Sequence, residues 1–102
     1  MKNYYIDLGS STIKMYCYTN ELTLIEEHSI YFKNDFDAEK GISKENLEEL
    51  CNYFTEIKAK YNLKYDNTNI YVTGIFRNLI PERKQELLKL FNDKFDLHFN
   101  II

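Results

Sequence analysis

The chain has 102 residues, a length that supports one domain with a single hydrophobic core. Its formal net charge is −3 at pH 7, with 13 basic and 16 acidic side chains interleaved, so it lacks the basic stripe that nucleic acids and anionic membranes require. No apolar run approaches the length of a membrane span, and we expect a cytoplasmic protein whose two cysteines, Cys17 and Cys51, are reduced and buried.

The first predicted strand contains an acid near its end and leads into a loop of small residues. An apolar run from Tyr4 to Leu8 includes Asp7, and residues 13–18 then alternate between apolar and polar side chains as a second strand. A glycine between the strands lets the backbone turn and approach a ligand closely, and hydroxyl side chains and backbone N–H groups offer donors to phosphate oxygens. The residues expected to bind phosphate in this loop are Gly9, Ser10, Ser11 and Thr12.

Asp7 is the candidate metal ligand of the same loop. Mg²⁺ keeps most of its waters and needs only one or two carboxylates beside a phosphate, so a single aspartate at the strand exit is enough. The alternative interpretation is a plain β-hairpin, because Asp-x-Gly followed by hydroxyl side chains is common in turns. From this pattern alone both interpretations stay open.

The middle of the chain predicts an edge strand and a helix. Residues 22–32 alternate over a long run of mixed polarity, which is typical of an edge strand, and His28 is expected to be solvated there. One side of this strand is expected to carry Leu22, Leu24, Glu26, His28, Ile30 and Phe32. Residues 33–40 are polar and predict a loop, after which Ser43 is a good N-cap for a helix that continues to Tyr61.

The last third of the chain predicts a buried strand, a loop, a helix and a final strand. Residues 70–73 form a short apolar run of the parallel type, and residues 74–79 form a loop at its exit. Pro81 suits the first turn of a helix whose apolar positions continue to Phe95. Residues 97–101 alternate as a fifth strand.

The predicted order β-β-β-α-β-α-β gives one α/β domain over residues 1–102, with a mixed five-stranded sheet of order 3-2-1-4-5. This is the ribonuclease H-like order. Both crossovers run in the same direction and are right-handed, so both helices are expected on one face of the sheet.

The other face of the sheet has no predicted cover. By strand alternation it carries Tyr5, Tyr16, Tyr18, Tyr71 and His98. A tyrosine has an apolar body and a polar tip, so such a face is suited to packing on a partner. The expected partner is either the second lobe of a longer protein or a second copy of the chain in a homodimer.

Residues 6–14, Ile-Asp-Leu-Gly-Ser-Ser-Thr-Ile-Lys, resemble the first phosphate loop of the actin, sugar kinase and Hsp70 ATPase superfamily. Within it, the chain most resembles the exopolyphosphatase and guanosine pentaphosphate phosphohydrolase family. Residues 72–77, Val-Thr-Gly-Ile-Phe-Arg, followed by a helix and by residues 99–102, are similar to a segment of that family in the same order. The small residues and the asparagine usual in this segment are replaced here at residues 74–76 and 78–80.

The resemblance implies a phosphate site and a polyphosphate or guanosine polyphosphate ligand. Arg77 would be the family's phosphate-contacting arginine, since a guanidinium offers paired donors, and Lys14 would contribute a second positive charge. Asp7 would hold Mg²⁺. In such enzymes an acidic pair follows the fifth strand and an Asp-Gly-Gly loop opens a second lobe. Neither is present in these 102 residues, so we assign no catalytic residue and expect no turnover by the chain alone.

Two other functions compete with this interpretation. A non-catalytic, actin-like assembly or interaction module would keep the loop as a structural turn and use the tyrosine face for contacts. A two-metal nuclease would need several convergent carboxylates, whereas the exit of the fourth strand offers Thr73 and Gly74, and the net charge is wrong for DNA.

Overall fold

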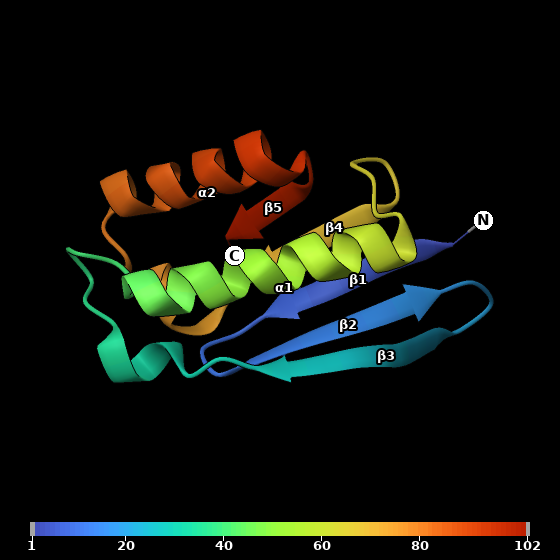
Figure 1. Cartoon of the computed structure of the whole chain (residues 1–102), viewed down its shortest axis with the longest axis horizontal. Helices are drawn as coiled ribbons and strands as arrows, with labels where there is room; N and C mark the ends of the chain where they lie inside the picture. Colours follow the sequence, from blue (N-terminus) through green and yellow to red (C-terminus); the bar gives the residue numbers. More distant parts are fainter. Residues whose placement is uncertain (1, 102) are drawn as a thin grey trace.

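A computed structural model, which describes residues 2–101, contains the expected mixed sheet and two long helices (Figure 1). Its elements are β1 (Asn3–Leu8), β2 (Thr12–Tyr18), β3 (Leu22–Ser29), α1 (Lys44–Tyr61), β4 (Thr68–Val72), α2 (Pro81–Phe95) and β5 (His98–Ile101), together with two short 3-10 helices, η1 (Phe32–Asp35) and η2 (Gly74–Asn78). The strand order is β3-β2-β1-β4-β5, with antiparallel pairing from β3 to β1 and parallel pairing from β1 to β5. The predicted fold class and strand order are confirmed.

Local signals in the sequence set the ends of both helices. The Oγ of Ser43 accepts a hydrogen bond from the N–H of Asn46 at 3.1 Å, which caps α1 as predicted. Pro81 occupies the start of α2, where its missing N–H costs nothing. Each helix ends at a residue in the left-handed conformation, Asn62 with φ 55° and Asp96 with φ 50°.

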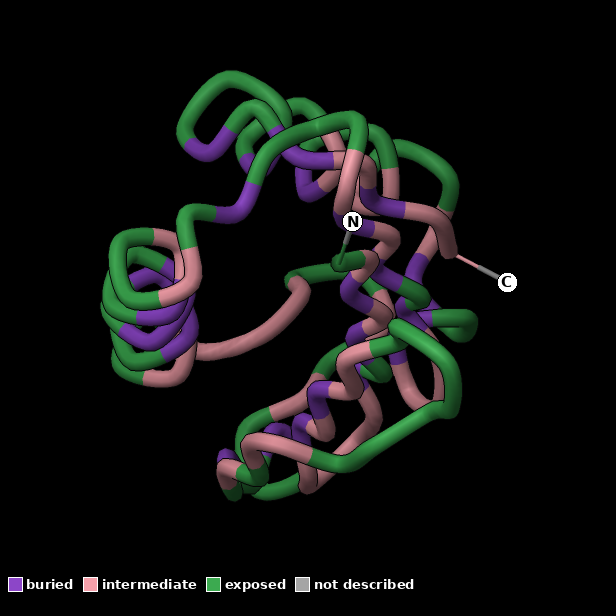
Figure 2. Tube along the Cα trace, turned by 90° about the vertical axis from the view of Figure 1, so that its right-hand side faces the viewer, coloured by how far each residue is buried: buried purple, intermediate pink, exposed green. Residues whose placement is uncertain are grey.

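The hydrophobic core lies between one face of the sheet and both helices. Figure 1 and Figure 2 show α1 and α2 on the same side of the sheet. Phe54 of α1 lies at the centre of an aromatic cluster, with its ring 6.2 Å from that of Phe91, 5.9 Å from Phe95 and 5.5 Å from Phe99 between centroids. The strand residues fully buried beneath the helices include Ile6, Leu8, Ile13, Met15 and Ile70. The two crossover helices therefore place the aromatic core on one side of the sheet.

The opposite face of the sheet carries the tyrosines, as predicted. Tyr5 of β1 is the register partner of Tyr16 of β2, and both are half-buried, whereas Tyr18 and Tyr71 are 43% and 36% exposed. His98 of β5 is half-buried. No helix within residues 2–101 covers this face, which we call the tyrosine face.

The expected alternation of β3 is wrong because the pairing with β2 contains a β-bulge. Met15 pairs with Glu26 whereas Tyr16 pairs with Leu24, so the register shifts by one residue between them. One extra residue reverses the side to which the following side chains point. Leu22 and Leu24, 56% and 47% exposed, therefore share the tyrosine face with Tyr18 and Tyr16 instead of lying beside Glu26.

Other features of β3 and its surroundings also differ from the expectation. The strand ends at Ser29, and Phe32 is fully buried in η1 instead of continuing the strand. His28 is not a solvated edge residue, because the bulge turns it toward α1. Its ring stacks on Tyr53 with centroids 4.4 Å apart, and its Nε2 lies 3.3 Å from a carboxylate oxygen of Glu49. Burial raises the pKa of Tyr53 to about 12.

The burial expected for the two cysteines is confirmed for one of them. Both thiols are free; Cys51 is buried as expected, whereas Cys17 is half-buried. None of the helices in residues 2–101 has the length and hydropathy needed to cross a membrane.

The bulge also gives Glu26 hydrogen-bond partners on α1. Its carboxylate accepts a hydrogen bond from the hydroxyl of Tyr61 and another, at 2.9 Å, from the Nζ of Lys60. The hydrogen bond from Tyr61, followed by that from Lys60, lowers the pKa of Glu26 below its ordinary value of 4.5. A charged Glu26 therefore stabilises the attachment of β3 to α1.

Replacing Glu26 with glutamine should reveal this contribution as a pH-dependent difference in stability. Because the folded-state pKa is lowered, the advantage of the wild type is present above pH 4.5 and is lost as the pH falls through the folded-state pKa. At pH 7 we expect a loss of less than about 1 kcal/mol, measured by urea denaturation. The control Glu21→Gln, at an exposed residue of the β2–β3 turn, should leave the stability at pH 7 unchanged, and a gap for Glu26→Gln that persists to pH 2 would contradict the assignment.

Candidate functional site

Two loops from distant parts of the chain meet at one edge of the sheet. The first, residues 9–11, follows β1, and the second begins at Thr73 after β4. Since β1 and β4 are parallel neighbours, with Leu8 the register partner of Val72, their carboxyl ends lie together. The N–H of Thr73 donates a hydrogen bond to the carbonyl oxygen of Leu8 at 2.9 Å, which extends the strand pairing into the second loop. This is the edge at which α/β sheets usually bind ligands.

Asp7 presents its carboxylate on the tyrosine face beside these loops. The side chain is exposed, and its register neighbours are Lys14 on β2 and Tyr71 on β4. The Oγ1 of Thr73 donates a hydrogen bond to the Oδ1 of Asp7 at 3.2 Å. Thr73 therefore belongs to the candidate site, although no role was predicted for it. Its position directly after a strand is the signal that could have identified it.

The first loop is closed by its own backbone. The N–H of Gly9 donates to the carbonyl oxygen of Thr12 at 3.1 Å, so this amide is already used within the turn. The carbonyl oxygen of Ser11 accepts a hydrogen bond from the N–H of Ile30 at 3.2 Å. Within residues 2–101 the N–H groups of Ser10 and Ser11 have no hydrogen-bond acceptor, which leaves them as the donors that this turn can offer to an anion.

The two loops are also joined side by side. The Oγ of Ser10 accepts a hydrogen bond from the N–H of Ile75 at 2.9 Å. Gly74 has φ +65°, and a Cβ at this position would lie 2.1 Å from the Oγ of Ser10 and 3.0 Å from its nitrogen. Only glycine combines this backbone conformation with so close an approach.

The two side chains predicted to supply positive charge, Lys14 and Arg77, lie on different elements. Lys14 is half-buried on β2 as the register partner of both Asp7 and Glu27. Arg77 is exposed in η2, two residues beyond Ile75, and no hydrogen bond or ion pair within residues 2–101 engages its guanidinium. The fold therefore brings Asp7, Lys14 and both loops to one edge, and attaches Arg77 to that edge through the second loop.

Oxygen donors at this edge fit a hard cation that keeps its waters. Asp7 supplies a carboxylate and Thr73 a hydroxyl, and among residues 2–101 no three histidine, cysteine or acidic side chains form a metal cluster. A single carboxylate holds Mg²⁺ when phosphate oxygens and waters complete its coordination. A protein-only metal cage would need more ligands than this edge provides.

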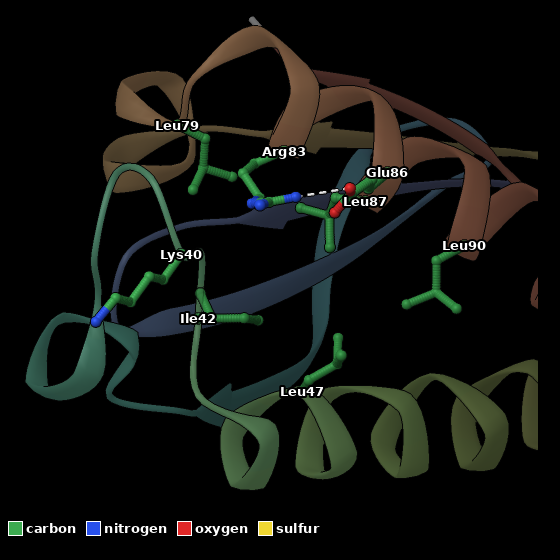
Figure 3. A pocket seen from close by; sticks show the side chains of 8 residues that line it. All are labelled: Lys40, Ile42, Leu47, Leu79, Arg83, Glu86, Leu87 and Leu90. Carbon is green, nitrogen blue, oxygen red and sulfur yellow. Dashed lines mark hydrogen bonds and ion pairs between the residues drawn. The ribbon is translucent and has the colours of Figure 1, made fainter.

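A cavity lies away from this edge, between α1 and α2 (Figure 3). Its lining consists of Lys40, Ile42, Leu47, Leu79, Arg83, Glu86, Leu87 and Leu90. Arg83 donates to a carboxylate oxygen of Glu86 and to the carbonyl oxygen of Glu39, both at 2.6 Å, so its polar groups are satisfied by the chain itself. None of the predicted site residues lines this cavity.

Comparison with solved structures places the whole chain among known folds. It is similar to the Aquifex aeolicus member of the Ppx/GppA protein family, with a TM-score of 0.69 and 16% identity over 100% of this chain and 35% of that one. It is also similar to an exopolyphosphatase from Cytophaga hutchinsonii, with a TM-score of 0.71 and 13% identity over 100% of this chain and 34% of that one. The resemblance stated from the sequence is therefore confirmed at the level of the fold.

A third similar structure is a Bacteroides thetaiotaomicron protein of unknown function with an actin-like ATPase fold. Its TM-score is 0.55 at 15% identity, over 99% of this chain and 32% of that one. This chain thus spans about a third of the length of the structures it matches. No protein-family model and no curated protein matches the sequence. The likeness therefore establishes an actin-like, ribonuclease H-like fold, while activity has to be argued from the site.

Replacing Gly74 with alanine should cost more stability than the same change at Gly41. Both glycines have positive φ, +65° and +92°, so both variants pay about 1 kcal/mol or more for the left-handed backbone. A Cβ added at Gly74 would also collide with Ser10, whereas a Cβ added at Gly41 would meet no atom within 4 Å. We expect Gly74→Ala to lose about 1 kcal/mol more in urea denaturation, through the Ser10 hydrogen bond. Equal losses would contradict the close contact between the loops.

Proposed function

We propose that this chain is the N-terminal subdomain of an exopolyphosphatase-like or guanosine pentaphosphate phosphohydrolase-like protein, and that it binds phosphate and Mg²⁺ where β1 and β4 end. The observation that carries the proposal is the hydrogen-bonded meeting of the two loops, through Ser10 and Ile75, at the ligand edge of a fold shared with such proteins. The two free thiols, Cys17 and Cys51, support the cytoplasm as its location.

Each proposed ligand contact follows from the chemistry of the side chain. Asp7 would bind Mg²⁺ through its exposed carboxylate, with the Thr73 hydroxyl holding that carboxylate in place. Lys14 would neutralise charge on the phosphate from the neighbouring strand, and Arg77 would offer paired N–H donors from the second loop. In the first loop, the free amides of Ser10 and Ser11 and the hydroxyls of Ser11 and Thr12 would donate to phosphate. Gly9, whose N–H is used within the turn, would let the backbone come close to the ligand.

The proposed role of this chain is to bind, and not to hydrolyse, a polyphosphate or guanosine polyphosphate. Phosphoryl transfer needs an in-line nucleophile and a group that orients or deprotonates water, in addition to charge neutralisation. Asp7 is the carboxylate that is hydrogen-bonded to the second loop through Thr73, and it is assigned to the metal. A second lobe would have to supply the remaining groups.

Magnesium and tripolyphosphate together should raise the thermal stability of the wild-type chain. A ligand present at a hundred times its Kd stabilises the folded state by about 2.7 kcal/mol. Asp7→Asn and Arg77→Ala should each abolish most of the shift, whereas Asp93→Asn and Lys89→Ala, exposed on α2, should keep it. A folded wild type that melts at the same temperature with and without ligand would overturn the proposal.

A second candidate function is a non-catalytic assembly module that uses the tyrosine face. The bulge in β3 favours it, because Leu22 and Leu24 join Tyr16 and Tyr18 in one exposed apolar patch. Parallel strands are almost always covered on both faces, and β1, β4 and β5 are parallel. We propose a second copy of this chain as the cover.

Charge supports a self-complementary contact at this face. Asp7, Lys14 and Glu27 form a row of register partners with alternating sign along one end of the tyrosine face. A copy related by a two-fold axis could place its lysine against these acids and its tyrosines against the apolar patch. A second lobe of a longer protein is the competing cover.

Replacing Tyr16 and Tyr18 together with glutamate should convert a dimer into a folded monomer, because the buried patch would then carry charge. Size-exclusion chromatography with light scattering measures the mass, and circular dichroism reports the fold. Tyr31→Glu, at a side chain 63% exposed outside the sheet, is the matched control and should leave the dimer intact. A wild type that stays monomeric at high concentration would contradict self-association.

A further inference from the structure

The Ser10 hydroxyl contacts the second loop of the site directly. Its oxygen accepts the N–H of Ile75 at 2.9 Å, a hydrogen bond between residues 65 positions apart in the chain. Gly74 packs against the same side chain closely enough that no Cβ fits between them. The hydroxyl is therefore engaged with the second loop before any ligand arrives.

This contact fixes the second loop relative to the first. Thr73 is held by the carbonyl oxygen of Leu8 and by Asp7, and Ile75 is held by Ser10. Arg77 follows within the same 3-10 helix, η2, so the position of its backbone depends on these anchors. A binding group that is already positioned loses less conformational entropy when the ligand arrives.

We infer that Ser10 is a positioning residue, which holds the loop of Arg77 in place and contributes to phosphate binding through that arginine instead of through its own hydroxyl. The inference rests on the proposed phosphate function. It implies a ligand that contacts both loops, as the condensed phosphate of the proposed function would. The neighbouring Ser11, whose hydroxyl makes no hydrogen bond within residues 2–101, provides the matched comparison.

A double-mutant cycle distinguishes positioning from direct binding. The affinity for magnesium tripolyphosphate is measured by calorimetry for the wild type, Ser10→Ala, Arg77→Ala and the double variant. We expect Ser10→Ala to weaken binding about tenfold in the wild type and less than twofold in the Arg77→Ala background. Ser11→Ala should have the same effect in both backgrounds. Independent, additive losses for Ser10→Ala and Arg77→Ala would show that the Ser10 hydroxyl binds the ligand directly and would overturn the inference.

Amide NMR provides a readout that needs no ligand. In the free chain, Ser10→Ala should shift the Ile75 amide signal, speed its hydrogen exchange and shift the amide of Arg77, while Ser11→Ala leaves these signals in place. If the wild type fails to bind tripolyphosphate, the proposed function fails, and these spectra alone decide the positioning role. Unchanged Ile75 and Arg77 signals in Ser10→Ala would overturn it whether or not the ligand binds.

Discussion

Parallel pairing of β1 with β4 is the constraint on which the candidate site depends. The two strands are separated in sequence by a hairpin, an edge strand and α1, yet their register sets Leu8 beside Val72. Their exit loops are consequently neighbours, and the hydrogen bonds from Thr73 to Leu8 and from Ile75 to Ser10 continue the pairing beyond the sheet. Without this parallel pairing, the loops that follow β1 and β4 would belong to unrelated parts of the surface.

The β-bulge in β3 has a second, independent effect on the molecule. It turns Glu26 and His28 toward α1, where they contact Tyr61 and Tyr53, and it leaves Leu22 and Leu24 on the tyrosine face. The same single-residue shift therefore attaches the edge strand to the core and enlarges the exposed apolar surface. The proposed phosphate site and the proposed partner surface therefore share Asp7 and Lys14, whereas Leu22 and Leu24 belong to the partner surface alone.

Periodicity and capping chemistry predict most of this fold. The N-cap at Ser43, Pro81 at the start of α2 and the alternation of β1 and β2 are local signals, and the crossover rule converts them into the strand order. The bulge could not be predicted because both sides of β3 carry apolar and polar residues. A shift of one residue therefore does not change the hydrophobic pattern of the sequence. Asp7 and the two loops were predicted from motif positions, whereas the Ser10–Ile75 bond depends on three-dimensional proximity that neither segment encodes alone.

The most direct test of the central claim, that the two loops form one phosphate site, is an amide NMR titration of the chain with magnesium and pyrophosphate. If they do, the amides of residues 9–12 and of residues 74–77 shift together and report a single Kd. Shifts confined to one loop, or signals of both loops that stay unchanged in a folded protein, would contradict it.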